Sequence, residues 1–342
     1  MDLKLKLSYF LTKLKLNAQT KMNKNRLKSG TEEKTYVTPY DLFKGINSDF
    51  ISVNINNREE LNNDFFEIIQ NLIKRGKKVE IRQNQKEVLN IEDIKRLEKI
   101  DSNILVDFRF LINSSYVGYN VDTSYDAKTY LQIYDKFNFL SQVAKEHFKT
   151  QDEQYFFVVS QLNDYISCDD SDLENLELSS LKGAFMNRKT VCIGFSLALQ
   201  RVCTQLNIPC VIMAGSNKST NLPNHAWNKV CLNGIWYNAE ITWLNTQGNI
   251  NQLLASDKDF QYHEAKAPIE EHECTVDYPQ DKISQLYSKM SVYKNVLEEY
   301  DKGVRKIAVL PIKTDKLKSS KRENIIIRDK ENDVDKDLMS KE

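Results

Sequence analysis

Residues 183–243 decide the fold, and their sequence is GAFMNRKTVCIGFSLALQRVCTQLNIPCVIMAGSNKSTNLPNHAWNKVCLNGIWYNAEITW. Its first half carries an apolar pattern with the spacing of one helix face, and Pro209 ends that pattern. Cys192 comes just before it and is therefore predicted to lie at or near a helix N-terminus. Unpaired amides and the helix dipole favour an anion there, so a thiolate would be stabilised. The alternative is a buried structural cysteine. The residues of the predicted helix face are Phe195, Leu199, Val202, Cys203 and Leu206.

The second half of the stretch predicts a β-hairpin. Asn233-Gly234 is a strong two-residue turn signal between two apolar strands. If these two residues form the loop, His225 lies opposite Thr242 and Trp227 lies opposite Glu240. His225 and Glu240 then become diagonal neighbours on one face, about 7–8 Å apart, within reach of long side chains. A β-bulge would break this register.

The same register divides the hairpin into two faces. One face is apolar and is predicted to face the core, whereas the other is polar and aromatic and carries the histidine and the carboxylate. The predicted core face holds Ala226, Val230, Leu232, Ile235, Tyr237, Ala239 and Ile241, and the second face holds His225, Trp227, Lys229, Trp236, Asn238, Glu240 and Thr242.

A cysteine, a histidine and a carboxylate together have a definite chemical logic. The histidine takes the thiol proton, and the resulting ion pair keeps the thiolate available as a nucleophile. The carboxylate holds the correct imidazole tautomer and stabilises the imidazolium, which then protonates a leaving amine. The chain has 4 histidines, and of these only His225 is predicted to lie in such a setting. The alternative for His225 is a satisfied core or turn histidine.

The motifs follow one another along the chain in a fixed order: VC-x-G-[FY], a helix, a glycine, HAWN-x-V, NG-x-WYN and TW. This order resembles the transglutaminase-like superfamily, and is most similar to bacterial members described as candidate cysteine proteases. The resemblance covers roughly residues 150–265. It implies an α+β, papain-like core in which a cysteine helix packs on an antiparallel sheet that bears the histidine and the acid. It also implies attack on an amide carbonyl through a thioester. The matching residues are Val191, Cys192, Gly194, Phe195, Gly215, His225, Ala226, Trp227, Asn228, Val230, Trp236, Tyr237, Asn238, Thr242 and Trp243.

The chain departs from this family where Glu240 replaces the usual Asp. Glutamate keeps the charge and can still orient a histidine, but it adds one methylene. A misplacement of about 1 Å can cost on the order of a hundredfold in rate, so this substitution bears on activity. The backbone N–H of Cys192 is the natural first oxyanion donor. Trp227 and Trp243 are candidates for the walls of a substrate cleft, with simple core packing as the alternative.

Outside this core, four regions are predicted. Residues 1–35 form a basic amphipathic tail and linker, and residues 36–125 form a small α/β domain with a β-α-β-α-β rhythm. Residues 126–275 form the transglutaminase-like catalytic domain, led by helices across 127–148 and 153–166. Residues 276–342 form a C-terminal helix, across 283–304, and a charged disordered tail.

Composition limits the classes of partner. The 48 basic and 48 acidic residues cancel, so nucleic acid is not predicted as a partner. The basic, leucine-rich residues 1–20 are the one segment that favours a weak membrane-surface contact, and a helix docked on the protein is the alternative. No apolar run of about 18 residues or signal sequence is evident. The six cysteines show none of the spacings typical of zinc sites, so we expect free thiols and no metal or other cofactor. Free thiols in turn favour a reducing compartment, and we expect a cytoplasmic location.

The leading hypothesis is a cysteine-dependent amide-bond hydrolase or acyl transferase acting on a protein or peptide through Cys192, His225 and Glu240. Hydrolysis is preferred to cross-linking, because no calcium-binding acidic loop is visible. The alternative is a non-catalytic protein-interaction module that retains the fold. Thiol reactivity separates the two, since an interaction module has no need of an activated cysteine.

Overall fold

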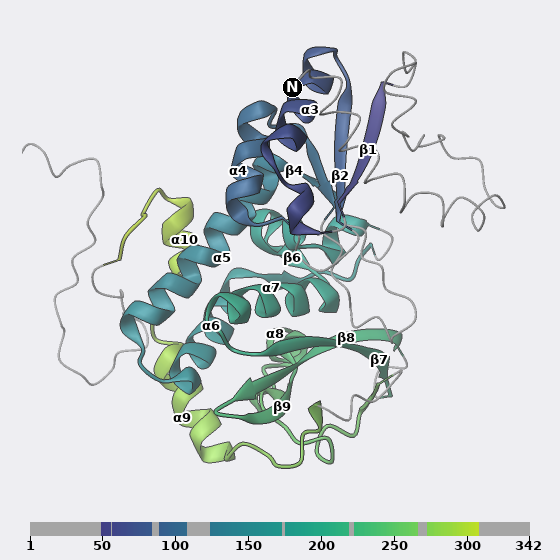
Figure 1. Cartoon of the computed structure of the whole chain (residues 1–342). Coiled ribbons are helices and arrows are strands. Elements are labelled where there is room, and N and C mark those ends of the chain that lie inside the picture. Colours follow the sequence, from purple (N-terminus) through teal and green to yellow (C-terminus); the bar gives the residue numbers. More distant parts are fainter. Residues whose placement is uncertain are drawn as a thin grey trace, which may run out of the picture. The chain divides into compact units, whose positions relative to one another are not determined.

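The computed structural model describes residues 49–55, 57–83, 89–107, 124–172, 175–218, 222–265 and 272–307 (Figure 1). The chain divides into two compact units. The first comprises Met1–Leu111 with Asn120–Gln132, and the second comprises Ile112–Tyr119 with Ile133–Glu342. The predictions for residues 1–35, including a membrane-surface contact, and for the tail beyond residue 307 lie outside the described residues.

The first unit is a small α/β sheet with the strand order β1-β2-β3-β4. β1, β2 and β3 are parallel, and β4 runs antiparallel to β3. This agrees with the predicted β-α-β-α-β alternation, because parallel neighbours need a crossover helix between them. The elements are β1 Phe50–Ile55, the short helix η1 Arg58–Glu60, α3 Asn63–Lys74, β2 Lys78–Gln83, α4 Ile91–Ile100, β3 Leu105–Asp107 and β4 Ser124–Asp126.

The apolar pattern across residues 58–74 is that of one continuous amphipathic helix, but the structure divides this segment, and α3 begins only at Asn63. Asn62 lies in an extended conformation, and its side chain accepts a hydrogen bond from the Phe65 amide, so it starts a new helix. The apolar face continues through the break because Phe65, Ile68, Ile69 and Leu72 are all buried.

Two long helices, α5 and α6, come next along the chain, close to the predicted ranges. The predicted C-terminal helix across 283–304 is wrong as a single element, since the structure divides it into α9 and α10. Asn295 causes the division by accepting hydrogen bonds from the amides of Leu297 and Glu298, which starts a second helix. The helices are α5 Ala127–His147, α6 Gln151–Tyr165, α9 Gln280–Met290 and α10 Val296–Asp301.

The core of the second unit is a four-stranded antiparallel sheet in the order β10-β7-β8-β9, and α7 packs across β7 and β8 (Figure 1). A cysteine helix on an antiparallel sheet is the α+β arrangement that the sequence predicted. The elements are β5 Ser167–Cys168, η2 Leu176–Ser179, the π-helical turn η3 Gly183–Asn187, β6 Lys189–Thr190, α7 Cys192–Gln205, β7 Cys210–Asn217, β8 Leu222–Leu232, β9 Ile235–Ala239, α8 Ile241–Gln247, η4 Ile250–Gln252 and β10 His263–Ala265.

The predicted hairpin register is confirmed from Leu232↔Ile235 to Asn228↔Ala239. Asn233 and Gly234 form the loop with positive φ angles of 53° and 84°. The predicted pairing beyond Ala239 is wrong, because Glu240 caps α8 and Thr242 lies within that helix instead of opposite His225. The strand therefore ends at the carboxylate, and Glu240 reaches the histidine from a helix cap.

The predicted core face of the hairpin is buried except for Ile235, which is 43% exposed. The second face is buried as well, since Trp227 on it is 3% exposed. The chain beyond η4 covers that second face, since Ala255 and Phe260 pack on Trp227 and Ala255 bridges to Asn238. The sheet is thus covered on both sides, and its polar residues are buried with partners.

No helix among the described residues is long and apolar enough to cross a membrane.

The approach of β10 to β7 requires glycine at position 215. A Cβ atom there would lie 2.1 Å from the Glu264 carbonyl oxygen and 2.8 Å from the Trp227 ring. We expect Gly215→Ala to lower the free energy of unfolding by about 1–3 kcal/mol, because backbone on β10 must shift. Urea unfolding measures this, with Ser216→Ala on the same strand as the control. Equal stability of the two variants would contradict the close approach.

Candidate active site

Cys192 is the first residue of α7, as predicted, and its side chain is half-buried. The preceding turn is tied to η2, since the Leu178 carbonyl accepts from both the Val191 amide at 2.9 Å and the Thr190 hydroxyl at 2.6 Å. Gly194 makes this contact sterically possible, because a Cβ atom there would lie 1.6 Å from the Thr190 hydroxyl oxygen. The backbone amides and the dipole at a helix N-terminus favour an anion, so this position suits a thiolate.

His225 lies on β8, opposite Gly215 on β7, and is 5% exposed. Its Nε2 atom lies 2.5 Å from Oε2 of Glu240. Cys192 interacts with the same imidazole, and this interaction is one of the causes that raise the pKa of His225. The structure thus brings together the three predicted residues from a helix N-terminus, a strand and a helix cap.

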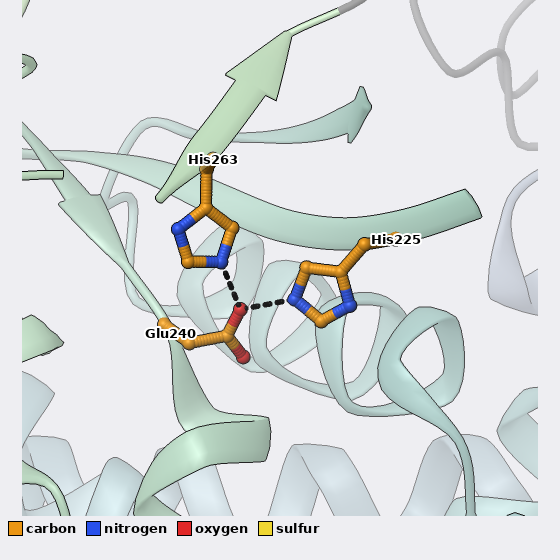
Figure 2. A group of neighbouring side chains, drawn as sticks. All are labelled: His225, Glu240 and His263. Carbon is orange, nitrogen blue, oxygen red and sulfur yellow. Dashed lines mark hydrogen bonds and ion pairs between the residues drawn. The ribbon is translucent and has the colours of Figure 1, made fainter. Parts of the chain in front are cut away.

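Glu240 is 1% exposed, and its two carboxylate oxygens have different partners. Oε1 accepts from the Thr242 amide at 2.8 Å and so caps α8. Oε2 accepts a hydrogen bond from His225 Nε2 and another, at 3.2 Å, from His263 Nε2, as Figure 2 shows. The cap fixes one oxygen to the backbone, which leaves the other directed at the two imidazoles.

The electrostatics of this group favour an ion pair. Burial lowers the pKa of His225, but hydrogen bonds to Cys192 and Glu240 outweigh it and raise the pKa to about 10. Burial raises the pKa of Glu240, but hydrogen bonds from His225 and His263 outweigh it and lower the pKa to about 2. Glu240 is therefore ionised and His225 protonated across neutral pH, with the charges of both compensated inside the protein.

His263 is a site residue that the sequence analysis missed, since only His225 was predicted to lie in such a setting. It begins β10 and is placed by the pairing His263↔Asn217 with the far end of β7. It lies 23 positions after Glu240, and no helix or strand lies between η4 and β10. The signal that could have found it is the run DFQYHE, in which an aromatic-rich stretch surrounds a histidine.

The two predicted cleft tryptophans are buried, and both pack against His263. The ring centroids lie 5.0 Å from His263 for Trp227 and 4.7 Å for Trp243. Trp227 also donates from its indole N–H to Asn238 at 3.2 Å. These contacts are those of core packing, and contact with a substrate stays a prediction for both residues.

His225, Glu240 and His263 could also be regarded as metal ligands, because their donor atoms lie within 4.8 Å of one another. Zinc bonds of 2.0–2.2 Å in tetrahedral geometry hold two ligand atoms about 3.3 Å apart. The 2.5 Å between His225 Nε2 and Glu240 Oε2 is much shorter, so a metal ion would have to push the two side chains apart. The arrangement fits hydrogen bonding, and the prediction that the site needs no metal stays a prediction.

The other cysteines have different surroundings. Burial, with nearby acidic groups, raises the pKa of Cys168 to about 11, and burial raises that of Cys274 to about 12. Cys203 is fully buried, and burial raises the pKa of Cys210. All six thiols are free in the structure, as predicted. Cys168 and Cys274 therefore serve as internal references for the reactivity of Cys192.

No family model and no curated protein matches this chain. Two solved structures are similar to it. One is a TGase, with a TM-score of 0.33 and 16% identity over 54% of this chain and 53% of that chain. The other is a candidate cysteine protease from Cytophaga hutchinsonii, with a TM-score of 0.30 and 16% identity over 39% of this chain and 42% of that chain. The chain thus spans about half, or less, of the length of these two structures.

The buried pair predicts a pH dependence of stability. Glu240 has a lowered pKa, so its contribution is complete above 4.5 and is lost as pH falls toward about 2. His225 has a raised pKa, so its contribution is complete below 6.5 and is lost as pH rises through about 10. Glu240→Gln is expected to lower the unfolding free energy by about 1.5–3 kcal/mol between pH 4.5 and pH 6.5, where both contributions are complete, and by less outside that range. Denaturant unfolding from pH 3 to pH 10 tests this, and a difference that does not change with pH would contradict the ion pair.

Proposed function

We propose that this protein is a cysteine-dependent enzyme that cleaves or transfers the acyl group of an amide bond in a protein or peptide. Cys192 is the nucleophile, His225 the general base and acid, and Glu240 the carboxylate that orients the imidazole. The observation that carries the proposal is the buried pair of His225 and Glu240, hydrogen-bonded at 2.5 Å, with Cys192 at the helix N-terminus among the groups that raise the pKa of His225.

The geometry supports a defined sequence of steps. The Cys192 thiolate attacks the amide carbonyl carbon, and the carbonyl oxygen becomes an oxyanion beside the first-turn amides of α7. The intermediate collapses as the C–N bond breaks, and the His225 imidazolium gives its proton to the departing amine. A thioester on Cys192 and a neutral imidazole remain.

The second half of the reaction restores the enzyme. The neutral His225 removes a proton from water, which attacks the thioester carbonyl, and the C–S bond then breaks to release a carboxylic acid and the thiolate. If an amine attacks in place of water, the product is a new amide. Glu240 stays ionised throughout and stabilises the imidazolium formed when His225 holds the proton.

The first experiment follows the alkylation of each cysteine by iodoacetamide with mass spectrometry between pH 5 and pH 9. We expect Cys192 to react at least about tenfold faster than Cys168 and Cys274 below pH 8, because only a thiolate is nucleophilic. His225→Ala should abolish this advantage. His147→Ala is the matched control, because its ring contacts a backbone carbonyl of Ile307 instead of the site.

If Cys192 reacts like the other cysteines and His225→Ala changes nothing, the catalytic proposal fails. The alternative of a non-catalytic interaction module then becomes the better description. If Cys192 is selectively reactive, incubation with a peptide mixture, with and without methylamine, separates the two chemistries. Hydrolysis yields free acids in both samples, whereas acyl transfer yields methylamides only when the amine is present.

A further inference from the structure

Two imidazoles converge on one carboxylate oxygen in this site. His225 Nε2 and His263 Nε2 lie 2.5 Å and 3.2 Å from the same Oε2 atom of Glu240 (Figure 2). An ionised carboxylate only accepts hydrogen bonds, so both Nε2 atoms must carry hydrogen. His263 is therefore bound to the site by donation from Nε2, and its ring is oriented by the carboxylate.

The surroundings of Nδ1, the other ring nitrogen of His263, indicate whether the ring is charged. Nδ1 is buried and has no hydrogen-bond partner among the described residues. A doubly protonated His263 would leave a charged N–H donor unsatisfied, next to the protonated His225, at a much greater cost than a bare lone pair. The titratable groups that face His263 are Glu240 and His225, and burial together with the His225 charge lowers its pKa. His263 is thus the neutral partner of Glu240, and His225 is the charged one.

Aromatic packing holds the His263 ring in this position. Phe260 stacks on it with a centroid distance of 3.9 Å and an interplanar angle of 16°. Trp227 and Trp243 pack around it, and the side chain is 0% exposed. A ring confined in this way has little freedom, so its N–H donor is aimed at Glu240 before any substrate arrives.

We propose that His263 is a positioning residue that holds Glu240 against His225 by donating a hydrogen bond from a neutral imidazole. The inference rests on the proposed function of the same site. It also gives a reason for the longer acid at position 240. The glutamate extends from the cap of α8 far enough to place one oxygen on the Thr242 amide and the other between two imidazoles.

Two variants separate hydrogen bonding from packing. His263→Phe keeps a planar ring for Phe260 but removes the donor, whereas His263→Gln removes the ring but keeps an N–H donor at the ε position. If His263 acts through its donor, the alkylation rate of Cys192 at pH 7 should fall about tenfold or more in His263→Phe. In His263→Gln the rate should stay within about threefold of the wild type.

The pH profile provides a readout that a packing role would not move. Loss of one donor raises the pKa of Glu240, so the acid side of the denaturant-unfolding profile, where the contribution of Glu240 is lost, should move to higher pH in His263→Phe only. If His263 serves packing alone, His263→Gln is the more damaging variant in thermal unfolding and this acid side does not move. That result would overturn the proposal, as would a wild-type profile for His263→Phe.

Nitrogen-15 NMR of the 4 histidines tests the same placement without any enzymatic activity. His263 is assigned by its absence from the His263→Phe spectrum, and at pH 7 it should show protonated Nε2 and bare Nδ1. A protonated Nδ1 would overturn the proposal. If Cys192 proves unreactive while His263 shows the expected tautomer, the proposed function fails but the hold of His263 on Glu240 stands, so the two failures are distinguishable.

Discussion

The buried carboxylate of Glu240 is the group on which the candidate site depends. It is 1% exposed, and an ionised carboxylate without partners at such a place would be far too costly to keep. The carboxylate has three partners from different parts of the second unit: the Thr242 amide, His225 and His263. The start of α8, β8 and β10 are therefore tied together at one side chain, and the backbone amide of the same residue bonds to the Gln252 carbonyl of η4.

Close backbone approach supplies the remaining constraint. Gly194 lets the turn before Cys192 lie against α7, and Gly215 lets β10 lie against β7. The first contact places the nucleophile at the helix terminus, and the second brings His263 to Glu240. Neither glycine has a positive φ angle, so each is needed for the space it leaves and not for its backbone freedom. Both belong to the motif that resembles the transglutaminase-like superfamily, which gives a steric reason for two of its positions.

Local patterns predicted much of this fold. The apolar period after Cys192, with Pro209 behind it, was sufficient to place α7, and Asn233-Gly234 was sufficient to set the hairpin register. The prediction failed where a side chain redirected the backbone. Glu240 ended the hairpin by capping α8, and Asn62 and Asn295 interrupted helices whose apolar period continued. Periodicity reports which residues are buried, but it does not report which polar side chain will capture a backbone amide.

The sequence by itself determined the cysteine helix and the hairpin register, because each follows from contacts between residues close along the chain. It also predicted that His225 lies near Glu240, but through a strand pairing that the structure replaces by the cap of α8. Only the tertiary structure decided that the polar face of the hairpin is covered, since the cover comes from Ala255 and Phe260. It also decided that a second histidine joins the site. His263 reaches Glu240 only because β10 pairs with the far end of β7, and strand pairing between distant segments leaves no local period to detect.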